Sequence, residues 1–230
     1  MTRLSKIGAA FAALLIFSGA QAAPPPRPYH IELEANTAAP FPYLTKFGTI
    51  TVHVYPAGVR AESIWLNGFS RLGTPTVTIE NPYGRMYTTM PVSEITTTIH
   101  KLKKESDIAS VPPPIAPPVS GKVRGIPASR YRLLYGPDAW IDVWTTDVIP
   151  ENAQLRNIVN AFVGGVSPST AASWKTIPGT PLYVELNFQH YKKLPLIRLK
   201  SFAMNNLGQE EALKVGSLYF RAPFLESIWK

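Results

Sequence analysis

Hydrophobic and polar residues alternate along most of the chain, which is typical of β-strands with one buried face. In the segment GTITVHVY, the apolar residues Ile50, Val52 and Val54 alternate with polar residues. Strands with one apolar and one polar face favour an antiparallel sheet. The same alternation predicts strands at residues 30–36, 58–66, 76–80, 85–90, 129–135, 140–146, 182–188 and 197–200. Short turn sequences separate them, at 56–58, 67–68, 81–84 and 178–179.

Helices are fewer. The clearest is expected in PENAQLRNIVNAFVGG, where Pro150 suits a first turn and Gly164 and Gly165 are expected to end the helix. Its apolar residues form one narrow stripe with helical spacing, consisting of Leu155, Ile158, Val159 and Phe162. A weaker helix is predicted over 93–105, and a short one after Ser167, with Ser167 as cap and Pro168 following.

These elements predict a mainly β fold with a few helices. Helices this short cannot cover the apolar face of nine or so strands, so the sheet is expected to curl. The predicted fold is a curled antiparallel sheet, an incomplete or half β-barrel, with the short helices on its concave face. Such a fold can enclose an apolar cavity.

A proline-rich segment, residues 108–121, lies between the two halves of the chain. Its prolines exclude a central strand and favour extended polyproline geometry. It is either a domain linker or a surface crossover. We favour the crossover, within a single domain over residues 23–230, because neither half holds enough strands for a sandwich of its own.

The N-terminus is typical of a signal peptide. Arg3 and Lys6 precede a short apolar run, 7–17, and Ala20-Gln21-Ala22 presents small residues to a signal peptidase. We expect residues 1–22 to be removed near Ala22 and the mature protein to be periplasmic or secreted. No later segment is long and apolar enough to predict a transmembrane helix.

Composition narrows the chemistry further. The chain has no cysteine, which excludes disulfides and a thiol nucleophile. Its formal charge is +8, but the basic residues are scattered, with one tight cluster at Lys101, Lys103 and Lys104. Export argues against nucleic acid as a partner. We therefore expect anionic partners, if any, to come from the cell envelope.

No motif predicts catalysis, a metal or a cofactor. The four histidines lack metal-ligand spacing, and the chain has neither a nucleophile elbow nor a phosphate-binding glycine loop. Carboxylates for glycoside hydrolysis are present, but no spacing selects a pair. The sequence predicts a protein that is not an enzyme.

The order of motifs resembles a known superfamily. VHVYPAGVRAESIW, NPYGRMYTTM, SRYRLLYGPDAWIDVWTT, IPENAQLRNIV, IPGTPLYVELN and SLYFRAP follow one another. This resembles uncharacterised exported families near the lipoprotein carrier LolA and the mycobacterial lipoprotein LppX. The resemblance implies an incomplete β-barrel closed by helices over a hydrophobic cavity that carries an acyl chain or lipid.

On that hypothesis, two sets of side chains line the ligand cavity. The helical stripe faces alternate residues of one strand, so the predicted ligand-binding residues are Leu155, Ile158, Val159, Phe162, Leu182, Val184, Leu186 and Phe188. The alternative is a structural or interaction module that binds an envelope protein or glycan through a basic, aromatic outer surface. Trp140, Trp144 and Trp174 are then the candidates for stacking on sugar rings.

Asp142 lies between two tryptophans in AWIDVWTT and is the residue most like an isolated catalytic carboxylate. Its surroundings depend on the preceding hairpin loop. An odd-length loop places Asp142 with Arg130, Arg132, Trp140 and Trp144, whereas an even-length loop leaves it unpaired among tyrosines and a leucine. The odd register satisfies every charge and is favoured; it makes Asp142 a strand-pairing carboxylate.

Overall fold

The computed structural model describes residues 27–35, 48–64, 66–102, 111–189, 193–204 and 210–223. The predicted signal peptide, 1–22, lies outside the described residues, as do Lys103 and Lys104. In the part of the chain that is described, none of the helices combines the length and the apolar character needed to cross a membrane.

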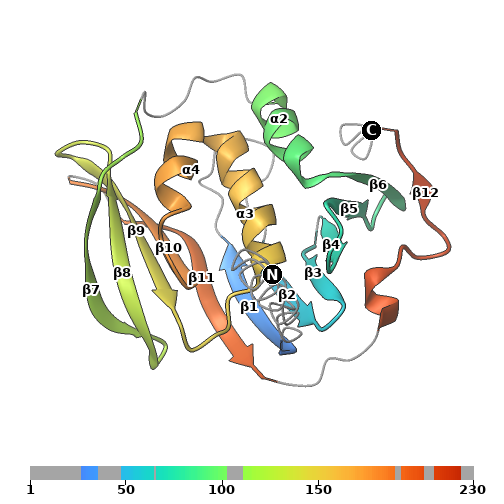
Figure 1. Ribbon diagram of the computed structural model, residues 1–230, viewed down its shortest axis with the longest axis horizontal. Coiled ribbons are helices and arrows are strands. Elements are labelled where there is room, and N and C mark those ends of the chain that lie inside the picture. Colours follow the sequence, from blue (N-terminus) through green and yellow to red (C-terminus); the bar gives the residue numbers. More distant parts are fainter. Residues whose placement is uncertain are drawn as a thin grey trace, which may run out of the picture.

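One open sheet of twelve strands dominates the described residues (Figure 1). The strands are β1 (Tyr29–Ala35), β2 (Gly48–Tyr55), β3 (Gly58–Glu62), β4 (Asn67–Arg71), β5 (Thr76–Asn81), β6 (Met86–Pro91), β7 (Ile115–Val123), β8 (Ile126–Leu134), β9 (Ala139–Thr146), β10 (Thr180–Phe188), β11 (Leu194–Ala203) and β12 (Phe220–Arg221). Their order across the sheet is β12-β6-β5-β4-β3-β2-β1-β11-β10-β9-β8-β7.

The order divides the sheet into two antiparallel meanders. Strands β1 to β6 follow one another in the N-terminal meander, and strands β7 to β11 in the C-terminal meander. The first strand, β1, joins the two by pairing with β11, while β12 adds to β6 in parallel. Figure 1 shows the sheet curled around the helices, so the prediction of a curled, mainly antiparallel sheet with helices on its concave face is confirmed.

The inner face of the sheet carries the core. Val52, Val54 and Val59 of the N-terminal meander are buried in one cluster with Leu182 and Leu199 of the C-terminal meander. Successive side chains of a strand point to opposite faces, so the polar residues between these positions lie on the outer face. Period-two alternation therefore explains both the pairing of the strands and the location of the core.

Three helices pack against the inner face: α2 (Val92–Leu102), α3 (Ala153–Val166) and α4 (Pro168–Trp174). Helix α3 begins later than predicted, because the side chain of Asn152 accepts a hydrogen bond from the Leu155 amide and caps it. Pro150 therefore precedes the helix. Ser167 caps α4 and Pro168 follows it, as predicted.

Gly164 and Gly165 do not end α3, contrary to prediction. Both are buried inside the helix, where α2 crosses it. A Cβ atom on Gly165 would lie 2.5 Å from Cβ of Ile99 and 3.1 Å from the carbonyl oxygen of Thr96. The two glycines are thus contact residues that let α2 and α3 approach closely.

Two other predictions needed correction. Asn67-Gly68 does not form a turn but begins β4, and β3 is shorter than predicted, because it ends at Glu62. The proline-rich segment is not wholly a crossover, since Ile115–Val123 forms the edge strand β7. Its pairing with β8 is shifted between Ala116 and Val119, where Pro117 and Pro118 lie. Proline has no backbone N–H to donate, and an edge strand tolerates it because one side of that strand has no partner.

Candidate functional site

Asp142 lies on the outer face and is paired with Arg132. The two residues are opposite one another in the β8–β9 ladder. Arg132 Nε donates to Asp142 Oδ1 at 2.7 Å and Arg132 Nη2 donates to Oδ2 at 2.9 Å. The Arg132 guanidinium also lies 4.8 Å from the centre of the Trp140 ring. The odd register is confirmed, and Asp142, although only 4% exposed, is a satisfied carboxylate.

The next strand extends this pair into a network. Glu185 of β10 is the cross-strand neighbour of Asp142 and is also buried. Its Oε2 accepts a hydrogen bond from the Tyr183 hydroxyl, and Asn187 donates weakly to Asp142 Oδ2 at 3.5 Å. Burial and the hydrogen bond to Glu185 raise the pKa of Tyr183 to about 12. Every acidic group here is held by a donor, so the arrangement favours a structural role over proton transfer.

A second network lies on the outer face of the N-terminal meander. Arg60 Nη2 donates to Glu80 at 3.0 Å, Nε donates to Glu62 at 2.6 Å, and Nη1 donates to the Ala212 carbonyl at 3.0 Å. Burial lowers the pKa of the nearby His53, helped by His30 and Arg60 and opposed by Glu62. Ala212 belongs to a short 3₁₀ helix, η1 (Glu210–Leu213), which covers this network.

Five of the eight predicted ligand-binding residues pack together in two core clusters. Leu155 and Ile158 pack against the cluster that contains Leu182, and Val159 packs against the cluster that contains Val184. Leu182 is fully buried and Leu186 half-buried. Phe162 and Phe188, at the ends of the two sets, are 42% and 41% exposed. The helical stripe therefore fills the curl of the sheet along most of its length.

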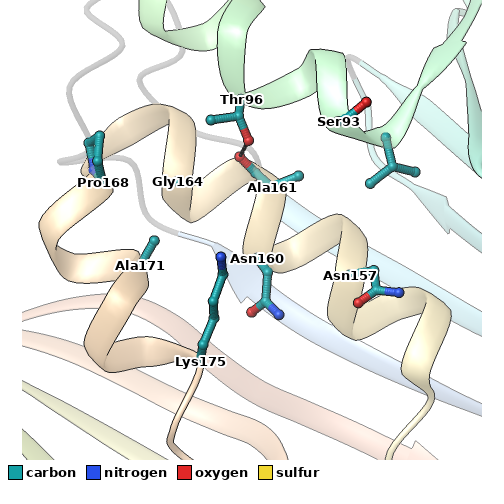
Figure 2. Close-up of a pocket in the computed structure, with 10 residues that line it drawn as sticks. Ser93, Thr96, Asn157, Asn160, Ala161, Gly164, Pro168, Ala171 and Lys175 are labelled. Carbon is teal, nitrogen blue, oxygen red and sulfur yellow. Dashed lines mark hydrogen bonds between the residues drawn. The ribbon is translucent and has the colours of Figure 1, made fainter.

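A hollow lies between α2, α3 and α4, on the side of α3 opposite the apolar stripe. Figure 2 shows the residues that line it. Its volume is about 400 Å³. We call it the helix groove; its lining residues are Val92, Ser93, Thr96, Asn157, Asn160, Ala161, Gly164, Pro168, Ala171 and Lys175. Helices α2, α3 and α4 all contribute to it, so its shape depends on how the three helices pack.

Contacts between the helices fix the walls of the groove. The Thr96 hydroxyl of α2 donates to the Ala161 carbonyl of α3 at 2.9 Å. The close crossing at Gly165 holds the same two helices together. Ser167 links α3 to α4, since its amide donates to the Val163 carbonyl and its side chain caps α4. The groove is therefore formed before any ligand arrives.

The polar lining residues are spread along the groove: Ser93 and Thr96 come from α2, Asn157 and Asn160 from α3, and Lys175 from the end of α4. Figure 2 shows the Lys175 side chain rising from the end of α4 beside α3. Asn160 Oδ1 is shielded from solvent and has no hydrogen-bond partner among the described residues. None of the described carboxylates forms an ion pair with Lys175. The other lining residues are small or apolar, and they include Val92, Ala161 and Ala171.

Two other candidates can be placed. Trp174, proposed as a sugar-stacking residue, is 6% exposed and packs in the core with Leu133 and Val143, so it is not a surface platform. A smaller hollow of about 230 Å³ lies at the ends of β7, β8 and β9, lined by residues including Ser120, Ser129 and Thr145. In the described part of the chain, no group of three or more His, Asp or Glu side chains could hold a metal ion.

A second set of residues with helical spacing in α3 indicates the helix groove in the sequence. Asn157, Asn160, Ala161 and Gly164 recur at i, i+3, i+4 and i+7, which places them on one face of α3. This second stripe is polar and small, so it leaves space where the first stripe fills it. Small and polar residues at helical spacing are therefore the pattern that indicates the groove.

Comparison with known proteins adds little to this geometry. No protein-family model and no curated protein matches the chain. Among solved structures, the chain is similar to an uncharacterized conserved protein from Thermus thermophilus, at 9% identity and a TM-score of 0.48. That match covers 92% of this chain and 99% of the other.

Proposed function

We propose that the protein is a non-enzymatic binding protein that carries an acyl chain or a similar apolar ligand, with the helix groove as its site. The observation that carries the proposal is the pre-formed hollow of about 400 Å³ between three helices, whose lining combines small or apolar residues with polar ones. Sites for small molecules are typically pockets of about 300–1,000 Å³, and this hollow falls within that range.

The filled curl of the sheet supports this location. Leu182, Val54 and Leu199 are almost fully buried, and the α3 stripe packs over them. An acyl chain between α3 and the sheet would have to displace those contacts. Exposing each large apolar side chain costs about 1.5–3 kcal/mol. Binding in the groove requires no such displacement. The ligand class expected from sequence is retained, and its site moves to the opposite face of α3.

The acidic networks of the outer face support a non-catalytic function. Asp142 is held by Arg132 in a two-point ion pair, and Glu185 is held by Tyr183. A general acid or base needs a proton-exchanging atom within reach of a substrate. Both carboxylates are instead buried under neighbouring side chains.

The test combines extraction with a groove-filling variant. Full-length protein purified without detergent is extracted with organic solvent, and the extract is examined by mass spectrometry for acyl compounds. The variant Asn157→Trp fills the groove from an exposed helical position and should lose at least tenfold in affinity for dodecyl ligands in calorimetry. The matched control, Thr97→Trp, is exposed on α2 outside the groove and should bind as the parent does.

Two results would contradict the proposal. One is an extract free of acyl compounds together with no calorimetric binding of any dodecyl ligand. The other is equal binding by Asn157→Trp and Thr97→Trp, which would place the ligand elsewhere.

A second candidate rests on a different observation, the arginine–tryptophan stacks of the C-terminal meander. Arg130 lies 5.7 Å from the centre of the Trp144 ring, beside the Arg132–Trp140 stack. Arg130 has no ion pair among the described residues. An acidic envelope glycan fits such a surface, and Arg130→Gln should weaken retention on an acidic but not on a neutral polysaccharide column.

A further inference from the structure

We infer that the smaller hollow, at the ends of β7, β8 and β9, binds a neutral sugar unit through a row of hydroxyl groups. This hydroxyl row consists of Ser120, Ser129 and Thr145, which all line the hollow. The inference goes beyond the proposed function, because this hollow shares no lining residue with the helix groove. It also differs from the acidic-glycan candidate, since Ser129 and the adjacent Arg130 point to opposite faces of the sheet.

Strand pairing places the three hydroxyl residues side by side. Ser120 of β7 is opposite Ser129 of β8, and Ser129 is opposite Thr145 of β9. Residues paired across antiparallel strands point to the same face, so the three side chains form one line across three strands. Two residues before Thr145 on that face lies Val143, which is fully buried in a core cluster with Trp174. The hydroxyl row therefore begins where the apolar core of the C-terminal meander ends.

The hydroxyl row is available to a ligand. No hydrogen bond among the described residues engages its side chains, whereas the neighbouring Thr146 hydroxyl donates to the Pro127 carbonyl. Thr145 is only 3% exposed, yet its hydroxyl is not one of the buried polar atoms that are cut off from solvent. Because Thr145 lines the hollow, a ligand there can reach this hydroxyl. A hydrogen bond at so sheltered a position is strengthened by the low local dielectric.

The charge of the lining selects the class of ligand. Asp147, directly after β9, is exposed and forms no ion pair in the described part of the chain. None of the described residues that line the hollow is basic. An anion would meet the Asp147 carboxylate without a counter-charge, whereas a sugar hydroxyl can donate a hydrogen bond to it. The lining therefore favours a neutral, polyhydroxylated ligand over an acidic one.

Tyr131 provides the apolar side of the site. It lies two residues from Ser129 on the same face, lines the hollow, and packs against the cluster that holds Leu133 and Val143. An aromatic ring beside hydroxyl groups suits a sugar, whose ring has both C–H and O–H surface. The volume of about 230 Å³ lies below the range of about 300–1,000 Å³ that is typical of drug-sized ligands, so the hollow suits one sugar unit.

The test is an NMR titration of isotope-labelled, full-length protein with glucose, galactose and N-acetylglucosamine. At least one of the three should shift the amide signals of Ser129 and Thr145 but not that of Thr51, a strand threonine of the N-terminal meander outside the hollow. Cyclohexanol, which has a ring but a single hydroxyl, should bind about tenfold more weakly than the best of these sugars. Glucuronate should also bind more weakly, because its carboxylate meets Asp147.

Three variants assign the roles. Thr145→Val removes the hydroxyl but keeps the shape of the side chain, and it should weaken binding of the best sugar about fivefold to tenfold. The matched control, Thr51→Val, should bind as the parent does. Asp147→Asn should bring the affinity for glucuronate close to that for the best neutral sugar.

A fourth variant, Ser120→Trp, fills the hollow from an exposed position and should abolish binding. Urea unfolding of each variant shows whether it retains the fold. If Thr145→Val does not fold, Ser120→Trp decides the outcome, and sugar binding by that variant overturns the inference.

Three further results would also overturn it. The first is that none of the three sugars shifts Ser129 and Thr145, and the second is that Thr145→Val binds as tightly as Thr51→Val. The third is that cyclohexanol or glucuronate binds as tightly as the best neutral sugar, because hydroxyl groups and charge would then not select the ligand. None of these results affects the proposal for the helix groove, whose ligands and variants are different.

Discussion

The two meanders carry the same arrangement on their outer faces but bury it to different depths. In each, a guanidinium group lies between a carboxylate and an aromatic ring: Arg60 with Glu80 and Phe69, and Arg132 with Asp142 and Trp140. The side chains of Arg60 and Glu80 are 13% and 2% exposed, whereas those of Arg132 and Asp142 are 32% and 6% exposed.

The difference comes from the C-terminal part of the chain. Helix η1 covers the Arg60 network, and Leu213 packs there against Tyr55 and Phe69. Arg60 and Arg71 also donate to the carbonyls of Ala212 and Leu213. No described segment covers Arg132 in this way. Both partners of the ion pair are thus buried in the N-terminal meander, whereas in the C-terminal meander the carboxylate is buried and the arginine is partly exposed.

The largest effect is expected from Arg60→Met. This variant leaves Glu80 buried without its counter-charge, so the free energy of unfolding should fall by about 3–5 kcal/mol. Urea unfolding followed by circular dichroism measures it. The double variant Arg60→Met, Glu80→Leu should regain much of the lost stability, because it also removes the unpaired buried charge. If Arg60→Met alone loses less than about 1 kcal/mol, burial of the network under η1 does not determine its contribution to stability.

A smaller effect is expected from Arg132→Met in the uncovered network. Asp142 keeps a hydrogen bond from Trp140 Nε1 at 3.3 Å, and solvent reaches the space that the guanidinium leaves. The loss should be about 1–2 kcal/mol by the same urea measurement. A loss equal to that of Arg60→Met would contradict the comparison.

Alkaline pH tests the C-terminal meander through Tyr183. Its pKa is raised to about 12 in the folded protein, above the ordinary value of 10.0, so its contribution to stability is complete below pH 10 and is lost as pH rises toward 12. Tyr183→Phe should make the fall in Tm between pH 9.5 and about 11.5 shallower. Part of the fall should remain, because burial also raises the pKa of Tyr29 to about 12.

Mild acid tests the N-terminal meander through His53, with the smallest effect. Its pKa is lowered in the folded protein, so below the ordinary value of 6.5 the unfolded chain takes up a proton more readily and stability falls. His53→Gln should reduce the slope of Tm between pH 7 and about 5. His100→Gln, an exposed histidine on α2, serves as the control, and an equal change in both variants would remove His53 as the cause.

The sequence predicted features that depend on alternation. Period two located β1, β2 and β10, and charge satisfaction along β8 and β9 selected the register that places Arg132 opposite Asp142. Such predictions succeed because each compares neighbours on one or two strands. They need no knowledge of what lies across the molecule.

The failures involve contacts that are distant in sequence. Gly165 was expected to end a helix, but the approach of Ile99 makes glycine necessary there. Val119 follows two prolines and nevertheless pairs with Arg130, because β7 lies at the sheet edge. The helix groove was missed because it needs α2, α3 and α4 together, and no single segment shows how three helices pack.

The central position of β1 has a consequence for how the chain folds. This strand is the first in the described sequence, yet it pairs with β11, which is the last long strand to be synthesised. Pairings between distant segments slow folding, because a large loop must close before they form. The N-terminal meander can collapse early from local hairpins, but β1 presents an unpaired edge until β11 arrives. The nascent chain therefore stays incomplete, and dependent on protection from association, until nearly all of it has been made.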